Sequence, residues 1–213
     1  MVSLQVLSVG LMLTTISLLY WKRIVTAIRI LALQSFFLGF IAIWMAARTG
    51  TSDLYVIAAL TILVKGLGIP WVLNYTLKKI DIHRETEKLI GRELSLLAGG
   101  ALLVVAYVTT SKLKISGMDV PHGVLAISIA MLLIGLLMMM THKKAIMQGI
   151  GLVVMENGLF LAALLLTYGM PFLVDIGVFL DIFVAVILIS MLTYRMDRVF
   201  QSTNTDHLRR LRG

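Results

Sequence analysis

Three ionisable side chains stand inside long apolar stretches of the sequence, where a charge is costly. Lys65, Glu156 and Asp181 each lie about 9 to 11 residues into such a stretch, which is roughly 14 to 17 Å deep at the ~1.5 Å rise of a helix. An ionisable group inside a membrane span is a functional candidate because its burial costs several kcal/mol. Burial disfavours the charged forms of acids and amines alike, which favours proton exchange near neutral pH. We therefore interpret the three residues as stations of a proton or ion relay.

A purely structural role is the alternative for the same residues. Lys65 paired with either Glu156 or Asp181 would form a buried ion pair that only fastens helices together. Asp175 lies about one turn inside the outer end of its stretch, so it either joins the relay or reaches water. Asn157, next to Glu156, is expected to hydrogen-bond that acid or an adjacent helix.

The residues after Lys65 predict an interrupted helix. Gly66, Gly68 and Pro70 follow the lysine within one and a half turns. Pro70 removes the backbone donor that would pair with the carbonyl group of Gly66, and it disfavours helical geometry at Ile69. A helix break here would free carbonyl groups to line a polar cavity, as in transporter cores. An ordinary proline kink is the other interpretation.

Glycines near Glu156 predict close helix packing, and no pattern predicts a metal site. Gly149, Gly151 and Gly158 are small enough to let two helices approach closely. The four histidines lie in loops or at the ends of apolar stretches, without the spacing of metal ligands; they are His83, His122, His142 and His207. The chain has no cysteine, which excludes disulfides, thiolate zinc sites and cysteine-ligated iron-sulfur clusters within it.

The composition requires membrane helices to carry these residues. Hydrophobic residues make up 59% of the 213 residues, charged residues 14%, and the mean hydropathy is +0.97. A soluble domain is roughly half apolar and a quarter charged. Long unbroken apolar runs favour helices as the spanning elements. We predict an all-α polytopic membrane protein, one integral membrane domain over residues 1–213, with about seven spans at roughly 2–20, 24–47, 54–77, 94–110, 122–140, 145–167 and 172–194.

The basic residues predict the orientation of the chain. The formal net charge of +8 comes from Lys and Arg residues in short loops, where they act as topology signals rather than as a nucleic-acid surface. With the N-terminus outside, Arg48, Lys112 and Lys114 face outward and most other basic residues face inward. The orientation predicts a cytoplasmic loop at 78–93 and a basic cytoplasmic tail at 195–213.

A weak internal repeat suggests two three-helix units, spans one to three and five to seven, joined by the fourth span. In each unit the first span ends in a short basic turn, Trp21-Lys22-Arg23 or His142-Lys143-Lys144. The fourth span would place both units in the same orientation. Basic inner turns in any membrane protein rich in hairpins give the same pattern without duplication.

The motifs resemble two related families. The basic turn at His142 and the run Gly151-Leu152-Val153-Val154-Met155-Glu156-Asn157-Gly158-Leu159 resemble subunit K of respiratory complex I, whose second helix carries a buried glutamate that Glu156 would match. Lys65-Gly66-Leu67-Gly68-Ile69-Pro70, Met155-Glu156-Asn157-Gly158 and the segment from Asp175 to Asp181 resemble component E of hydrogenase-4-type and formate hydrogenlyase membrane complexes. This second resemblance covers nearly the whole chain.

The resemblance implies a membrane-arm subunit of a group 4 nickel-iron hydrogenase or a related oxidoreductase, in the prokaryotic cell (inner) membrane. Such a chain is no enzyme by itself and helps to move protons or sodium ions. Its partners would be antiporter-like and other membrane subunits and a hydrogenase-type peripheral arm. The nickel-iron and iron-sulfur centres would lie in those partners, with no cofactor in this chain. Subunit K has a second buried glutamate in its third helix, where this chain offers Asp175 and Asp181.

Two other functions fit the same sequence. A stand-alone small secondary transporter would use the interruption after Lys65 as its substrate site. A structural anchor would hold an antiporter-like subunit in the membrane and move no ions.

Overall fold

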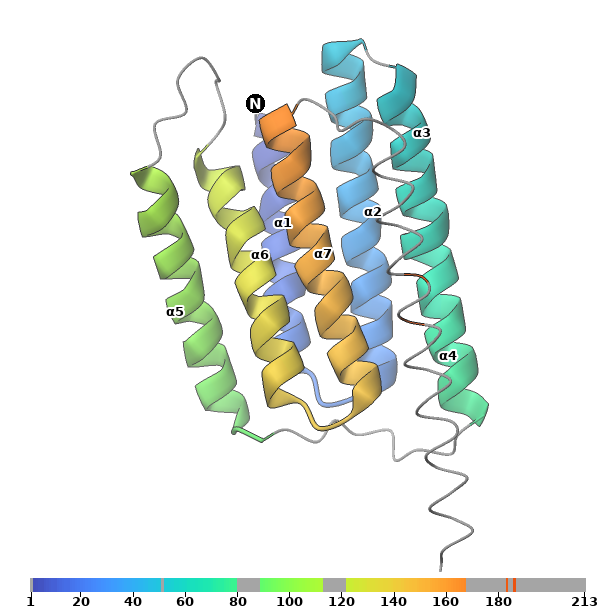
Figure 1. Cartoon of the computed structure of the whole chain (residues 1–213), viewed down its shortest axis with the longest axis vertical. Helices are drawn as coiled ribbons and strands as arrows, with labels where there is room; N and C mark the ends of the chain where they lie inside the picture. Colours follow the sequence, from blue (N-terminus) through green and yellow to red (C-terminus); the bar gives the residue numbers. More distant parts are fainter. Residues whose placement is uncertain are drawn as a thin grey trace, which may run out of the picture.

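The regular elements of the chain are all helices in the part that the structure describes, residues 2–50, 52–79, 89–112 and 122–167 with single positions at 183 and 186 (Figure 1). The structure is a computed structural model. Its elements in chain order are α1 (Val2–Tyr20), α2 (Ile24–Thr49), α3 (Ser52–Leu60), the π-helix η1 (Thr61–Gly68), α4 (Ile69–Lys79), α5 (Arg92–Ser111), α6 (His122–Thr141) and α7 (Ala145–Thr167). The first six predicted spans each fall on one of these helices, with α3, η1 and α4 forming a single one.

Five of the helical spans are long and apolar enough to cross a membrane, and α1 contributes a shorter apolar segment, Leu4–Tyr20. The all-α polytopic class is therefore confirmed. Apart from the helical positions Phe183 and Val186, the predicted span 172–194 lies outside the described residues, as do most of the loop 78–93 and the tail 195–213. At the described end of that loop, the amide of Leu89 donates to the carbonyl oxygen of Thr141 at 2.8 Å.

The outer surface of the bundle is apolar around its middle and aromatic near its ends. Large side chains such as Leu13, Phe40, Leu97 and Val104 are exposed on different helices. Water would not favour such a surface, whereas hydrocarbon does. Near the end that holds the α1–α2 turn, the ring of Tyr20 lies 4.7 Å under the Arg92 guanidinium. Tyr and Trp commonly mark the membrane interface in this way.

Two helical hairpins run in the same direction in the bundle. The turns 21–23 and 142–144 lie at the same end, the lower one in Figure 1, so α1 is parallel to α6 and α2 to α7. α1 packs against α6, and α2 packs against α7. This arrangement fits two units in one orientation, although duplication itself stays a prediction. At the opposite end, α2 closes on Gly50, whose φ of 68° suits a residue without a side chain.

Glycines bring the backbones of α6 and α7 into direct contact. A Cβ added to Gly135 would lie 2.5 Å from the amide nitrogen of Met155, and one added to Gly158 would lie 2.6 Å from the carbonyl oxygen of Ser128. At Gly151 the nearest atom would be the carbonyl oxygen of Gly135, at 2.9 Å. The close helix contact predicted at Gly151 and Gly158 is confirmed, and it sets the position of Glu156 between them.

The helix that carries Lys65 does not break at Pro70. The chain stays helical from Ser52 to Lys79 and widens into a π-helix over Thr61–Gly68, where the amide of Ile69 bonds the carbonyl oxygen of Val64, five residues earlier. The predicted unwound segment is therefore absent from this described span. A proline ring clashes with the carbonyl group of the preceding turn, and a wider turn relieves the clash while the chain remains hydrogen-bonded. Lys65 lies within the widened turn.

Candidate functional site

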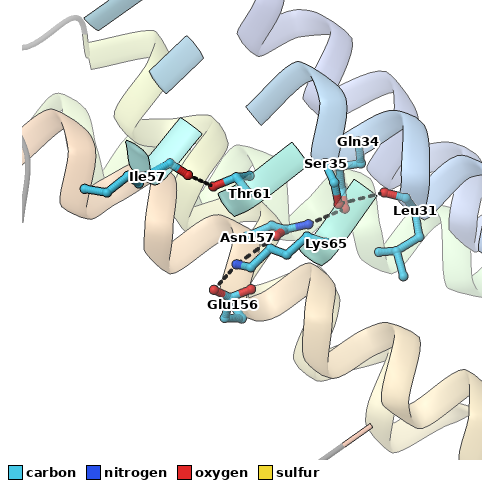
Figure 2. Close-up of polar contacts among 8 residues, drawn as sticks. All are labelled: Leu31, Gln34, Ser35, Ile57, Thr61, Lys65, Glu156 and Asn157. Carbon is cyan, nitrogen blue, oxygen red and sulfur yellow. Dashed lines mark hydrogen bonds and ion pairs between the residues drawn. The ribbon is translucent and has the colours of Figure 1, made fainter. Parts of the chain in front are cut away.

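Lys65 and Glu156 form a buried ion pair between η1 and α7 (Figure 2). The lysine side chain reaches across to the carboxylate, and Nζ donates to Oε1. Lys65 is 0% exposed and Glu156 is 3% exposed. Glu156 is the central residue of α7 (Ala145–Thr167), so the pair lies halfway along the membrane-spanning helix. Each charge depends on the other for compensation because water is excluded at this depth.

The ammonium group of Lys65 faces three electron-rich groups from one turn of α7. Besides the Glu156 carboxylate, the side-chain oxygen of Asn157 lies 3.5 Å from Nζ, and the centroid of the Phe160 ring lies 5.2 Å away. A carboxylate, an amide oxygen and the face of an aromatic ring all attract a positive charge. This side of α7 therefore provides a site suited to a cation, which the lysine occupies.

A chain of hydrogen bonds continues from Asn157 across two more helices. The Asn157 side-chain nitrogen donates to Oε1 of Gln34 on α2 at 3.1 Å, and Nε2 of Gln34 donates to the Thr15 hydroxyl on α1 at 2.8 Å. The Thr15 hydroxyl donates in turn to the carbonyl oxygen of Leu11 at 2.8 Å. Asn157, Gln34 and Thr15 are each 0% exposed. Buried polar networks of this kind fix relative helix positions when every member is paired.

One atom of the site stands apart from this pairing. Oε2 of Glu156 has no hydrogen-bond partner among the described residues. A buried carboxylate oxygen without a partner is costly, so this atom strongly favours accepting a proton or a hydrogen bond. Within the described residues, the ion pair is therefore closed on the side of Lys65 and Asn157, and Oε2 of Glu156 is left on its other side.

The structure brings together three residues of the predicted relay. The residues of the predicted helix break lie in a continuous helix instead. Lys65, Glu156 and Asn157 meet, and Lys65 pairs with Glu156, one of the two partners considered for it. Asp175 and Asp181 lie outside the described residues. Gly66 packs against the Phe36 ring, which a Cβ at Gly66 would meet at an ordinary 3.6 Å, and Gly68 and Pro70 belong to the continuous helix.

Sequence reasoning missed Gln34 and Thr15. Neither side chain is ionisable or adjacent to an ionisable residue, so the cost of burying a charge does not single it out. The signal was present, since Gln34 and its neighbour Ser35 are a polar pair in the middle of the apolar stretch 24–47. Polar residues that bridge transmembrane helices are a general feature of membrane bundles.

Comparisons with known proteins place the chain in a family. The uncharacterized protein Rv0085 of Mycobacterium tuberculosis is 32% identical over 205 residues, which cover 95% of this chain and 93% of that protein. The chain belongs to the family of this mycobacterial protein. No family model and no solved structure matches the chain.

A more distant similarity extends to hydrogenase-4 component E. The Escherichia coli protein of that name is 24% identical over 203 residues, or 95% of this chain and 94% of that protein, and component E of Shigella flexneri matches to the same extent. The resemblance to component E is thus confirmed as a distant homology over almost the whole chain. The relation to subunit K of complex I stays a prediction.

Proposed function

We propose that the chain is a membrane-arm subunit of a hydrogenase-type oxidoreductase complex, in which the Lys65–Glu156 pair contributes to moving protons or sodium ions across the membrane. The distant homology to hydrogenase-4 component E and the membrane-spanning helices support the first part of the proposal. The single observation that carries the second part is the buried ion pair at the centre of the bundle. Burying a charge pair at that depth is costly, and ionisable residues inside membrane spans mark ion and proton pathways.

The chemistry of the pair suits proton transfer. When the proton of the hydrogen bond moves from Nζ of Lys65 to Oε1 of Glu156, an ammonium and a carboxylate become a neutral amine and a neutral acid. The low polarity of the bundle interior destabilises the ammonium and the carboxylate together. It therefore brings the charged pair closer in free energy to the neutral amine and acid. Oε2 of Glu156 is the atom on which a proton can be exchanged with groups outside the pair. The pair can thus hold a proton in either of two states without a change in net charge.

The same proposal specifies the partner subunits and the orientation of the chain in the membrane. The redox centres lie in partner subunits, because a chain without cysteine offers no thiolate for iron-sulfur clusters. Antiporter-like membrane subunits contact the chain laterally and continue the ion route. The bundle end that carries the basic turns 21–23 and 142–144 faces the cytoplasm of a prokaryotic cell, with the N-terminus outside. If the last span belongs to a subunit-K-like unit, Asp175 and Asp181 are further stations of the relay.

Purification of the tagged native chain in mild detergent tests membership in the complex. We expect antiporter-like subunits and a nickel-iron oxidoreductase to accompany it. Recovery of the chain alone, together with substrate-driven flux after its reconstitution by itself, would instead identify a stand-alone transporter. The chain alone should show no such flux if it is a subunit.

A structural anchor is the second candidate, because a direct ion pair between η1 and α7 also holds helices together. The double variant Lys65→Met/Glu156→Met separates the two functions, since removing both charges spares the bundle an uncompensated charge. We expect the complex to assemble and to transfer electrons but to move no ions. Normal ion movement in this variant would establish the anchoring role and remove the proposed one.

A further inference from the structure

The hydrogen bonds from Thr15 to Asn157 determine which atom of Asn157 faces the lysine. We propose that Gln34 and Thr15 are positioning residues: they hold the Asn157 carbonyl oxygen toward Lys65 and thereby keep the lysine paired with Glu156 as an ammonium. This inference rests on the proposed function, since it assigns to two further residues the control of the same ion pair. It concerns α1 and α2, which contribute no charged group to the site.

Thr15 determines which group donates and which accepts in each hydrogen bond of the network. The Thr15 hydroxyl gives its only hydrogen to the carbonyl oxygen of Leu11, so it can offer Gln34 nothing but lone pairs. Gln34 must therefore present its NH₂ group to Thr15, which turns its oxygen toward α7. A flipped Gln34 would place its oxygen 2.8 Å from the Thr15 oxygen, and the Thr15 hydroxyl would have to give up its bond to Leu11 to donate to it.

The orientation of Gln34 determines the orientation of the Asn157 amide in the same way. Facing an oxygen of Gln34, Asn157 must present its NH₂ group to α2, and its own oxygen is left on the side of Lys65, 3.5 Å from Nζ. A flipped Asn157 would instead aim two donor hydrogens at an ammonium group. An oxygen there favours the charged lysine, whereas an NH₂ group would disfavour it.

The three residues act by orientation and carry no protons themselves. Amide side chains do not release or accept a proton near neutral pH, and the Thr15 hydroxyl is bound to a backbone carbonyl. Within this network of described residues, only Lys65 and Glu156 can therefore exchange protons. Gln34 and Thr15 change the balance between the charged and neutral pair without lying on the route of the ion.

Three substitutions and one matched control isolate this role. Thr15→Val keeps the shape of the side chain and removes the oxygen that Gln34 needs, while Thr15→Ser keeps the hydroxyl. Gln34→Met keeps the length and removes the amide. Ser35→Ala serves as the control, because Ser35 is equally buried at 0% on the same helix but donates to the Leu31 carbonyl within α2 at 3.1 Å.

The measurement is ion movement per electron-transfer turnover by the purified complex in lipid vesicles, with the amount of assembled complex determined in parallel. We expect Thr15→Val and Gln34→Met to lower this ratio by about three- to tenfold, the scale of one lost buried hydrogen bond. Thr15→Ser and Ser35→Ala should retain the wild-type ratio. Because the effect passes through Asn157, Thr15→Val should cause no further loss in an Asn157→Leu background.

Two results would overturn the inference. The first is a wild-type ratio in both Thr15→Val and Gln34→Met. The second is a loss that follows only the amount of assembled complex and that Thr15→Ser shares, which is the signature of a merely structural role. Glu156→Gln, measured alongside, separates failure of the proposed function from failure of the positioning role. If Glu156→Gln moves ions normally, the proposed function is wrong. If Glu156→Gln loses ion movement while Thr15→Val keeps the wild-type ratio, only the positioning role is wrong.

Discussion

Lys65 on η1 and Glu156 on α7 are 91 residues apart in the sequence, yet they form an ion pair in the centre of the bundle. The contact depends on two features of the backbone. The π-helical turn over Thr61–Gly68 carries the lysine, and the glycine-mediated packing of α6 on α7 sets the position of the glutamate. The geometry of the pair is therefore a property of the whole bundle rather than of either helix.

Removing one member of the pair should destabilise the protein more than removing both. Lys65→Met leaves the Glu156 carboxylate buried and uncompensated, which we expect to lower the free energy of unfolding by ~3–5 kcal/mol. Lys65→Met/Glu156→Met should recover most of that loss, because apolar residues of similar size replace both charges. Thermal unfolding of the purified protein in mild detergent measures the difference.

Lys143→Met is the matched control for that comparison, since Lys143 is exposed at the α6–α7 turn and its replacement should leave the unfolding temperature nearly unchanged. If the single variant Lys65→Met were as stable as the wild type, the two charges would not depend on each other in the folded protein.

The contact between α6 and α7 should be sensitive to a single methyl group. Gly135→Ala places a Cβ 2.5 Å from the Met155 amide nitrogen, and Gly158→Ala places one 2.6 Å from the Ser128 carbonyl oxygen, so the helices must separate. We expect each change to cost ~1–3 kcal/mol. Because Met155 and Gly158 flank Glu156, ion movement should fall as well.

Gly100→Ala on α5 provides the comparison, because a Cβ at Gly100 meets no atom of another described element within 4 Å. This variant should be as stable as the wild type or slightly more stable, since alanine favours helix over glycine. Equal stability of the α5 and the α6–α7 variants, measured as unfolding temperature, would contradict the backbone contact.

The orientation of the chain can be read by chemical labelling, since the native sequence has no cysteine to react. Thr49→Cys places a thiol at the exposed end of α2, and Lys143→Cys places one at the exposed basic turn between α6 and α7. In spheroplasts, a membrane-impermeant maleimide should label Thr49→Cys directly and Lys143→Cys only after the cells are permeabilised. The reverse pattern would show that the basic turns face outward.

The sequence alone was sufficient for the helices of the described residues but only in part for the site. Apolar stretches of about twenty residues predict spans reliably, because the bilayer leaves the backbone few alternatives. The depth of Lys65 and Glu156 followed from counting residues along those spans. Their pairing could not be deduced in the same way, since rotation about each helix axis depends on side-chain packing that a single sequence does not display.

The helix break predicted after Lys65 shows a second limit of prediction from the sequence. Two glycines and Pro70 indicated a disturbed helix, and the helix is disturbed, but as a π-helical turn rather than as a break. Both solutions remove the clash at the proline ring. The choice between them depends on tertiary contacts, such as the packing of Gly39 on α2 against Ile62 of η1. The hydrogen bonds of Gln34 and Thr15 were likewise hidden, because they join helices whose contacts only the folded bundle defines.

Ion movement during turnover shows most directly whether Glu156 carries protons or sodium ions. The purified complex, reconstituted in sealed vesicles, would be supplied with its electron donor and acceptor while a pH-sensitive or sodium-sensitive dye reports the ion gradient. We predict that Glu156→Gln keeps electron transfer and loses most of the gradient, whereas Glu93→Gln, at the exposed start of α5, behaves as the wild type. A wild-type gradient in Glu156→Gln, with normal assembly and turnover, would contradict the proposed role of the ion pair.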